Sequence, residues 1–435
     1  MSTDADSAAT SHVHVYKDAR RVGLLSRDDA GRLTFVYDEA VAHDPSAAVS
    51  VRLPVRRQPY PDHQAFPCFE NLLPEGDLRE LLARSVHRAE GDVVGLLGVF
   101  GGECAGALSL WPEGSAPPLV PEYRPCTAAE LRDAFGVARD EARLARTLRE
   151  GRLSMSGAQD KLVLYRRPAV GAGSHGSQPH YALPVAGAPS TVLVKRERGR
   201  FDGMVQNEMA SMDLMRAAGV PTASHAPHAL DGSLYETARF DRVLNEDGSV
   251  VRQHAEDGCQ LTGRTSLAKY ARQGGPAYAD LVAVLNRHGL TPLEDVELLF
   301  RWAVANLALG NRDAHAKNVS VLHVQPMTVR FAPAYDVVCT LAYPALDDEL
   351  PLRFGGQLTV AALTPRSLVK AAREFRLAPA RARDLTAAVC DGIVAALPDA
   401  LHGVERVAGH HEILDRLDRT VREQTALTRS ALLGG

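Results

Sequence analysis

The hydrophobic periodicity changes along the chain, and this change is the feature that most constrains the fold. In the first part of the chain, short alternating segments predict β-strands, among them HVHVY (12–16), LTFVY (33–37) and VSVRLPV (49–55). From residue 152 to about 245 the pattern is mixed, and beyond about 246 helical spacing dominates. We therefore predict an α+β fold with a β-rich N-terminal part and an all-helical C-terminal part.

The length of the chain and its breaks predict several packed units. A chain of 435 residues is too long for one ordinary core, and the Pro-rich segment 111–125 is typical of a linker. We expect a disordered tail over 1–11, a β-rich subdomain over 12–115, a mixed α/β part over 116–245 and a helical part over 246–435.

Two helix starts follow from capping signals. Thr127 and Glu130 have the T-x-x-E spacing in which each residue satisfies the backbone N–H of the other. Thr291 and Glu294 repeat that spacing with a proline between them at the first helical position. The second helix is expected to end at Gly310.

Composition excludes several classes of protein. The six cysteines occur singly, without a C-x-x-C pair, so we expect no structural metal site and a reducing compartment. The first eleven residues are polar, and no apolar run approaches the roughly 18 residues of a membrane span. A net charge of −4 gives no general attraction to nucleic acid. We expect a cytoplasmic protein without membrane contact.

The segment NRDAHAKN (311–318) carries the strongest chemical pattern. Phosphoryl transfer from ATP needs a carboxylate that accepts the hydroxyl proton, oxygen ligands for Mg²⁺, and a lysine for the phosphates. Asp313 and Asn318 have the D-x-x-x-x-N spacing of a kinase catalytic loop. Two short strand-like segments follow, and they are expected to return Asp336 to the side of Asn318, where both offer oxygen ligands to Mg²⁺.

A lysine and a small-residue loop lie upstream of this segment. Lys195 ends the β-branched strand TVLVK (191–195), and Glu208 lies on the next expected helix, so the two side chains are able to form an ion pair. The segment RLSMSGAQDK (152–161) offers backbone N–H groups and hydroxyls that could cover phosphates.

Each of these features also has a plain structural interpretation. Asp and Asn are common in turns, and the D-x-x-x-x-N spacing arises by chance. A lysine at a strand end, such as Lys195, often lies along the surface with its charge in water. His315 is consistent with a simple loop histidine, Lys317 with a solvated charge, and the 152–161 loop with a generic Gly/Ser turn.

Taken together, the motifs resemble the HipA family of serine/threonine kinase toxins. The resemblance extends from about residue 12 to the C-terminal helices and implies a distant protein-kinase-like fold. The motifs that carry it are FENLLPEG (69–76), SMSGAQDK (154–161), ARFDR (238–242), and NRDAHAKN (311–318) followed by AYDV (334–337).

The resemblance implies a role for individual residues. Asp313 would be the catalytic base, and Asn318 and Asp336 would hold Mg²⁺. The implied ATP-binding residues are Ser156, Gly157, Ala158, Gln159, Asp160, Lys161, Lys195, Ala238, Arg239, Phe240, His315, Ala316, Lys317, Asn318, Tyr335 and Asp336.

The resemblance also implies regulation by autophosphorylation. Ser154 matches the serine whose phosphorylation ejects the phosphate loop and silences the kinase. This is physically reasonable, because a phosphate adds roughly −1.5 to −2 charges and cannot share a site with the ATP phosphates. Three positions depart from the family pattern. Ala238 replaces a frequent Glu, Ser156 adds a second hydroxyl, and Asp160 stands in place of Glu.

The family's substrates include aminoacyl-tRNA synthetases, especially glutamyl-tRNA synthetase, whose phosphorylation arrests growth. A protein hydroxyl, ATP and Mg²⁺ are therefore the expected substrate and cofactors. DNA would be contacted only through a helix-turn-helix antitoxin. Two alternatives stay open from the sequence, namely a small-molecule phosphotransferase similar to aminoglycoside kinases, and a kinase-like corepressor that acts with such an antitoxin.

Overall fold

The structure is a computed structural model that describes residues 11–134, 141–154, 161–167, 180–196, 201–343 and 348–434. It contains two compact units. The first consists of Met1–Leu193 and Asp241–Ala255, and the second of Val194–Phe240 and Glu256–Gly435. Both contain strands and helices, so the predicted α+β class is confirmed.

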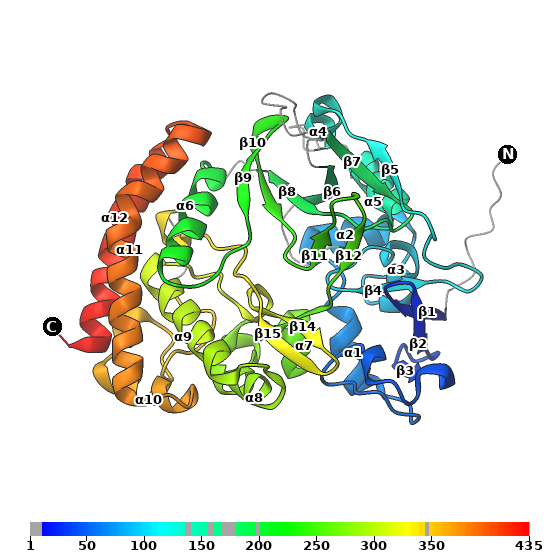
Figure 1. Cartoon of the computed structure of the whole chain (residues 1–435), viewed down its shortest axis with the longest axis horizontal. Helices are drawn as coiled ribbons and strands as arrows, with labels where there is room; N and C mark the ends of the chain where they lie inside the picture. Colours follow the sequence, from blue (N-terminus) through cyan, green and yellow to red (C-terminus); the bar gives the residue numbers. More distant parts are fainter. Residues whose placement is uncertain are drawn as a thin grey trace. The chain divides into compact units, whose positions relative to one another are not determined.

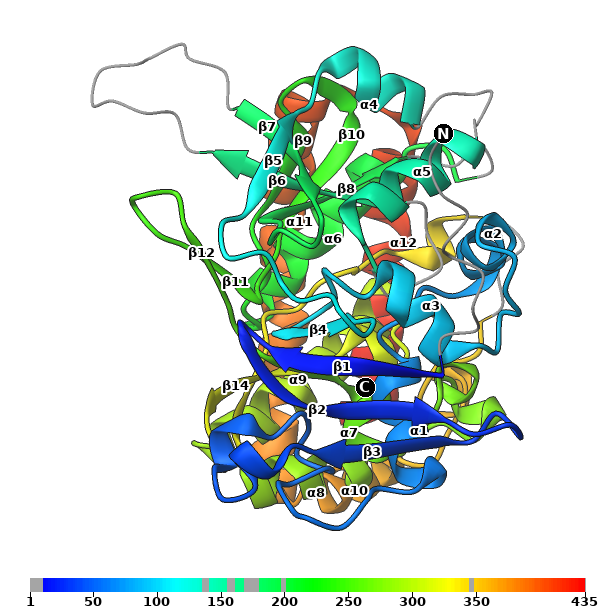
Figure 2. The same ribbon diagram turned by 90° about the vertical axis from the view of Figure 1, so that its right-hand side faces the viewer.

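The first sheet of the first unit is antiparallel, with the strand order β3-β2-β1-β4 (Figure 2). Its strands are β1 (His12–Lys17), β2 (Arg20–Arg27), β3 (Leu33–Tyr37) and β4 (Leu108–Trp111). Val13 and Val15 of β1 are fully buried, and His14 between them points to the other face. The strands predicted at 12–16 and 33–37 are confirmed.

The strand predicted over 49–55 is wrong. That segment forms a single bridge between Ser50 and Leu53. Its backbone instead binds a buried side chain, because the hydroxyl of Tyr37 donates to the backbone oxygen of Leu53 and accepts the N–H of Val49 at 2.9 Å. One phenol thus satisfies backbone groups that a β-ladder would otherwise pair.

The first unit also contains a second set of strands and several helices. Its strands are β5 (Glu122–Pro125), β7 (His180–Val185) and β6 (Lys161–Arg167), in that order, and the hairpin β11 (Arg242–Leu244) and β12 (Val250–Arg252). Its helices are α1 (Asp62–Glu70), α2 (Gly76–Ser85), α3 (Val93–Phe100), α4 (Ala128–Ala134) and α5 (Glu141–Gly151). The capping box predicted at Thr127 is confirmed, since Glu130 N–H donates to its hydroxyl at 3.2 Å and the Glu130 carboxylate accepts the Thr127 N–H at 2.9 Å.

Glu103 is fully buried and joins several segments of the first unit. One carboxylate oxygen accepts from Arg242 at 3.0 Å and from the backbone and hydroxyl of Ser190, both at 2.9 Å. The other oxygen accepts from Arg252 at 2.7 Å. The backbone oxygen of Glu103 accepts the N–H of Ser154 at 3.0 Å. The side chain of Glu103 thus joins Ser190 and the β11–β12 hairpin, and its backbone oxygen holds Ser154.

The second unit combines two small sheets with a group of helices (Figure 1). The sheets have the orders β8-β10-β9, with β8 (Val192–Arg196), β9 (His225–His228) and β10 (Asp231–Ala238), and β13-β14-β15, with β13 (Ala255–Asp257), β14 (Ser320–Gln325) and β15 (Thr328–Phe331). The helices are α6 (Met204–Ala217), α7 (Gly258–Thr262), α8 (Tyr278–His288), α9 (Pro292–Leu309), α10 (Pro365–Glu374), α11 (Pro379–Ala408) and α12 (Glu412–Leu433). The hairpin expected after residue 318 is confirmed as β14 and β15.

Helix α9 packs on α6, α8, α11 and α12 and supplies much of the core of the second unit. Phe300 is fully buried, and its ring lies 5.1 Å from that of Phe375 and 6.0 Å from that of Phe354. The helix ends, as predicted, at Gly310, whose φ of 69° is easy for glycine and costly for other residues. The turn at Gly310 directs the chain into the 311–318 segment.

The capping box predicted at Thr291 is wrong. The Thr291 side chain makes no capping hydrogen bond at the start of α9. Its backbone, at φ −128° and ψ 74°, departs from the extended conformation that brings an N-cap hydroxyl to the first turn. Pro292, which has no N–H to satisfy, still begins the helix.

Helix α11 is the one described helix long and apolar enough, by length and composition, to cross a membrane. In this structure it packs on α6, α9 and α12, and it lies alongside α12 in Figure 1. Its buried side chains include Leu385, Val389 and Ile393. The core helix of a folded domain meets the same criterion.

Replacing Phe300 by Ala tests the packing of the second unit. We expect Phe300→Ala to lower the free energy of unfolding by about 3–5 kcal/mol, because it leaves a cavity between two aromatic rings. The matched control is Leu293→Ala on the same helix, where the side chain is 65% exposed and the expected change is within about 0.5 kcal/mol. Urea unfolding followed by circular dichroism measures both, and equal effects would contradict the packing described.

Candidate active site

Lys195 lies between two carboxylates from different parts of the second unit. Its ammonium donates to Glu208 Oε1 at 2.7 Å and to Asp336 Oδ1. Lys195 comes from β8, Glu208 from α6, and Asp336 from the segment after β15. Lys195 and Glu208 are buried, whereas the Asp336 side chain is 32% exposed. The ion pair expected from the sequence is therefore present, and a second carboxylate joins it.

Burial and charge act against each other in this cluster. Burial alone would lower the pKa of Lys195, but the charges of Asp336 and Glu208 offset this and hold its pKa above the usual value. Burial raises the pKa of Glu208 to about 7, and the nearby charge of Asp336 adds to the rise. The two carboxylates share one ammonium, and Glu208 is the more buried of the two.

Helix α6 also fixes the backbone that carries Asp336. The fully buried Asn207 accepts the N–H of Cys339 at 2.9 Å and donates to its backbone oxygen at 3.0 Å. Ser211 donates to the same Asn207 oxygen at 3.1 Å. Asp336 itself has a φ of 57°, a conformation that Asp tolerates better than most residues. Neighbouring residues of one helix thus hold Lys195 and the Asp336 segment.

The 311–318 segment is closed by its own hydrogen bonds. The side-chain oxygen of Asn311 accepts the N–H of Asp313 at 2.9 Å. The side-chain nitrogen of Asn318 donates to the backbone oxygen of Asp313 at 2.8 Å, which leaves its amide oxygen as the atom able to bind a metal. The Asp313 side chain is 53% exposed, and one of its oxygens accepts from the hydroxyl of Tyr270. The loop therefore presents a carboxylate on a rigid backbone.

His315 and Lys317 point inward from the same loop. Burial, aided by the positive charge of Lys269, holds the pKa of His315 well below its usual range, so its imidazole is neutral. Its Nδ1 is buried and lacks a hydrogen-bond partner among the described residues. Lys317 donates to Asp257 at 2.6 Å, and both are buried, so the interpretation of Lys317 as a solvated charge is wrong.

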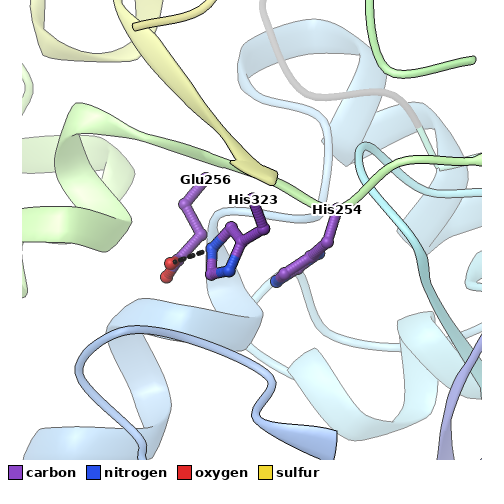
Figure 3. Close-up of side chains that lie close together, drawn as sticks. All are labelled: His254, Glu256 and His323. Atoms are coloured by element: carbon purple, nitrogen blue, oxygen red, sulfur yellow. Dashed lines mark hydrogen bonds and ion pairs between the residues drawn. The ribbon is translucent and has the colours of Figure 1, made fainter. Parts of the chain in front are cut away.

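Asp257, the ion-pair partner of Lys317, is the last residue of β13 in the sheet β13-β14-β15. It caps α7 by accepting the N–H of Gln260 at 2.9 Å. The preceding Glu256 lies 2.8 Å from His323 Nε2 on β14 (Figure 3). His254, also drawn in Figure 3, belongs to the first unit, where its Nδ1 accepts the N–H of Ala107 and its Nε2 lies 2.9 Å from the backbone oxygen of Val49. Both ring nitrogens of His254 are thus used within that unit.

Tyr335 connects the two halves of the expected metal site. Its hydroxyl donates to the backbone oxygen of Lys317 at 2.6 Å and lies 2.6 Å from the hydroxyl of Ser320. Since Tyr335 precedes Asp336 and Lys317 precedes Asn318, this bond joins the segments that carry the two candidate ligands. The ring of Tyr335 also stacks on Phe240, with centroids 5.2 Å apart.

The expected hinge, residues 238–240, has part of its backbone already in use. The N–H of Ala238 donates to the backbone oxygen of Ser224 at 2.7 Å. Arg239 is buried, and Phe240 stacks on Tyr335. An adenine at this hinge would therefore have to use backbone groups other than the Ala238 N–H.

Most of the expected phosphate loop falls outside the described residues. Ser156, Gly157, Ala158, Gln159 and Asp160 lie outside the described residues. Lys161 begins β6 and is partly exposed. Ser154 is fully buried, and its hydroxyl donates to the backbone oxygen of Leu72 at 2.8 Å. The FENLLPEG motif (69–76) thus contacts the start of the SMSGAQDK motif (154–161).

Three residues of this site were missed by sequence reasoning. They are Asn207, which holds the Asp336 segment, Asp257, which pairs with Lys317, and Tyr270, which binds Asp313. Asn207 had a usable signal, because it is a polar residue directly beside Glu208 on a helix with an otherwise largely apolar interior. Asp257 and Tyr270 lie in segments with no pattern that points to the 311–318 segment.

Comparisons with known proteins give a consistent result. The family model "HipA N-terminal domain" matches residues 13–111, and "HipA-like C-terminal domain" matches residues 153–397. The Sinorhizobium fredii protein named "Putative kinase Y4mE" is 34% identical over 80% of this chain and 82% of its own length. "Serine/threonine-protein kinase toxin HipA" of Shewanella oneidensis is 28% identical over 65% of this chain and 64% of its own length.

A solved structure has the same fold. It is that of the Shewanella oneidensis HipA, HipB and operator DNA complex, in which the matching chain aligns with a TM-score of 0.77 at 21% identity. The alignment covers 96% of this chain and 99% of that one. At this level of identity the likeness shows the fold.

The raised pKa of Glu208 predicts a pH dependence of stability. Between pH 4.5 and about 7 the unfolded chain has lost the Glu208 proton while the folded chain keeps it. The folded state then binds more protons, so stability falls as pH rises through this window. We expect the free energy of unfolding of the wild type to fall relative to that of Glu208→Gln between pH 5 and 7. Above pH 8 the difference between the two free energies should stay constant.

Urea unfolding at pH 5, 6, 7 and 8 measures this difference. The matched control is Glu297→Gln, because the ion pair with Arg381 lowers the pKa of Glu297 and places its own transition below the window. Parallel curves for wild type and Glu208→Gln from pH 5 to 7 would show that Glu208 is ionised throughout.

Proposed function

The chain belongs to the HipA family, and from this premise we propose that it is a Mg-ATP-dependent serine/threonine protein kinase of the HipA toxin type. The observation that carries the proposal is the buried ammonium of Lys195 between Glu208 and Asp336, in the same unit as the Asp313–Asn318 loop. These are the residue types that phosphoryl transfer requires.

The residues present fit Mg-ATP. Asn318 and Asp336 offer one neutral and one charged oxygen ligand, the hard donor set that Mg²⁺ prefers. When ATP binds, the Lys195 ammonium would release Asp336 and bind the phosphates, while its ion pair with Glu208 would keep the lysine in place. Nδ1 of His315, which has no hydrogen-bond partner among the described residues, suits a contact with the nucleotide. When bound, ATP supplies the phosphoryl group, and Mg²⁺ supplies positive charge that neutralises the phosphate oxygens. His315 to Asn318 and residues 238–240 are proposed to line the nucleotide site.

Asp313 is proposed to act as the general base. Its half-exposed carboxylate is the group of the loop that a protein hydroxyl can reach from solvent. It accepts the proton of that hydroxyl, while the loop backbone, fixed by Asn311 and Asn318, keeps the carboxylate from moving away. The neutral His315 beside it adds no charge that would weaken the base.

We propose Ser154 as the site of inhibitory autophosphorylation. Its hydroxyl is fully buried and bound to Leu72, so a phosphate there would place about two negative charges in a space that now holds one hydrogen bond. The phosphorylated segment would have to leave that position, which would remove residues 156–161 from the nucleotide. Ser156 is the alternative phosphoacceptor in the same loop.

The substrate and partners are proposals from family membership. A component of translation is the first candidate substrate, with an aminoacyl-tRNA synthetase such as glutamyl-tRNA synthetase as the first to test. The related Shewanella protein was solved with HipB and operator DNA, which supports a DNA-binding antitoxin as partner. Since the net charge here is −4, DNA contact is proposed only through such a partner, in the cytoplasm.

Two alternatives have less support. A small-molecule phosphotransferase similar to aminoglycoside kinases would not need the N-terminal unit that matches the family over residues 13–111. A corepressor without catalysis would not need the Lys195–Glu208–Asp336 cluster beside an ordered catalytic loop.

Removing the base or the metal ligand tests the kinase proposal. We expect Asp313→Ala and Asp336→Ala to reduce transfer of label from γ-labelled ATP to lysate proteins by about 100-fold or more, because general-base catalysis and charge neutralisation are both lost. Asp391→Ala, which removes an exposed carboxylate on α11, is the control and should label normally. Full transfer by both active-site variants would exclude the assignment, and a labelled small molecule would favour the phosphotransferase.

Replacement of Ser154 tests the regulatory proposal. After incubation with Mg-ATP, mass spectrometry of wild type is expected to find phosphate on Ser154, and Ser154→Ala should stay active for longer. Ser156→Ala is the matched control, because it removes the neighbouring hydroxyl and should still be silenced. Phosphate found on Ser156 instead, with Ser154→Ala silenced normally, would contradict the choice of site.

A further inference from the structure

Tyr270 touches the proposed catalytic base. It directly precedes the 3-10 turn η4 (Ala271–Gln273), and its hydroxyl donates a hydrogen bond to Oδ1 of Asp313. We propose that Tyr270 is a positioning residue, whose phenol orients the Asp313 carboxylate for proton abstraction. The inference deepens the proposed function and depends on it.

This contact acts on the side chain of Asp313, whereas the loop's own hydrogen bonds act on its backbone. The side-chain oxygen of Asn311 accepts the N–H of Asp313, and the side-chain nitrogen of Asn318 donates to the backbone oxygen of Asp313. The Asp313 side chain is 53% exposed, and Nε2 of His315 lies 3.8 Å from its Oδ1, beyond hydrogen-bonding distance. The phenol supplies a directional hydrogen bond to a charged acceptor, which is among the stronger kinds.

Tyr270 is itself held against the catalytic loop. Its ring meets His315 edge-on, with centroids 5.0 Å apart and planes at 85°. Its backbone oxygen accepts the N–H groups of Gln273 and Gly275, both at 2.9 Å. The preceding Lys269 accepts the N–H of Ala316 at 3.2 Å. The loop that carries Asp313 and the segment that carries Tyr270 are therefore joined by one backbone hydrogen bond and one side-chain hydrogen bond.

Because the phenol binds Oδ1 of Asp313, the two carboxylate oxygens have different roles. A carboxylate accepts several hydrogen bonds, so Oδ1 can keep the phenol while Oδ2 faces the acceptor hydroxyl. The acceptor's proton passes to Asp313, the acceptor oxygen bonds to the γ-phosphorus, and the bond from that phosphorus to the ADP oxygen breaks. Tyr270 keeps its own proton throughout, so it acts through Asp313 and exchanges nothing with the substrate.

A competing interpretation gives the opposite kinetic sign. If the phenol occupied the place of the acceptor hydroxyl, it would inhibit the enzyme, and its removal would speed transfer. The fixed backbone of Tyr270 and the ring contact with His315 favour a permanent part of the site over an occupant that must leave in each turnover.

Tyr270→Phe tests the inference, because it removes one hydroxyl and keeps the ring against His315. The readout is ADP formed from Mg-ATP by the full chain, since ADP appears whichever hydroxyl, that of a protein or of water, accepts the phosphoryl group. We expect kcat to fall by about 10- to 100-fold, with KM for ATP changed less than about twofold, because only the orientation of the base is lost.

Two controls separate positioning from general damage. Tyr37→Phe removes a phenol that donates to Leu53 in the first unit and should leave both kinetic constants unchanged. The unfolding midpoint of Tyr270→Phe should match that of wild type, because a half-exposed hydrogen bond contributes little to stability.

The outcomes are distinguishable. An active wild type with an equally active or faster Tyr270→Phe overturns the inference and leaves the proposed function standing. A rise in KM for ATP equal to the loss in kcat/KM, with kcat unchanged, also overturns it, because the phenol would then serve nucleotide binding. A wild type that forms no ADP overturns the proposed function and the inference with it.

Discussion

The ion pairs of the Lys195 ammonium with Glu208 and Asp336 hold three segments of the second unit together. A buried charge is costly unless it is paired, and here the pairing requires β8, α6 and the segment after β15 to converge on one atom. Glu208 supplies one carboxylate and Asp336 the other, while Asn207, next to Glu208, binds the backbone three residues beyond Asp336. Because α6 binds both Lys195 and the segment that carries Asp336, a shift of α6 would move these two residues together.

The proposed catalytic loop, residues 311–318, is linked to this cluster by hydrogen bonds from side chains to backbone oxygens. Gly310 ends α9 and starts the loop, and the side chain of Asn318 closes it on the backbone of Asp313. Tyr335, the residue before Asp336, donates its hydroxyl to the backbone oxygen of Lys317 near the end of the loop. Lys317, anchored to Asp257, makes the loop part of the core rather than of the surface. A kinase needs this rigidity, because the base and the metal ligands are useful only in fixed relative positions.

Sequence reasoning found the elements whose signals are local. The Gly310 stop, the β14–β15 hairpin and the D-x-x-x-x-N spacing all lie within short segments, and the Lys195–Glu208 pair follows from a strand and the next helix. It failed where side chains from distant segments decide the outcome. Tyr37 replaced the ladder expected for 49–55, and Asn207, Asp257 and Tyr270 act on residues between 43 and 132 positions away. No local pattern encodes such contacts.

Asn318 and Asp336 are proposed to form one Mg-ATP site with Lys195. The most direct test of this proposal is anomalous diffraction from crystals grown with Mn²⁺ and a non-hydrolysable ATP analogue, since Mn²⁺ binds at Mg²⁺ sites and is visible by its scattering. We expect a Mn²⁺ peak at bonding distance from the amide oxygen of Asn318 and a carboxylate oxygen of Asp336, with the Lys195 ammonium on the phosphates. A nucleotide-bound Mn²⁺ with neither residue as ligand would contradict it.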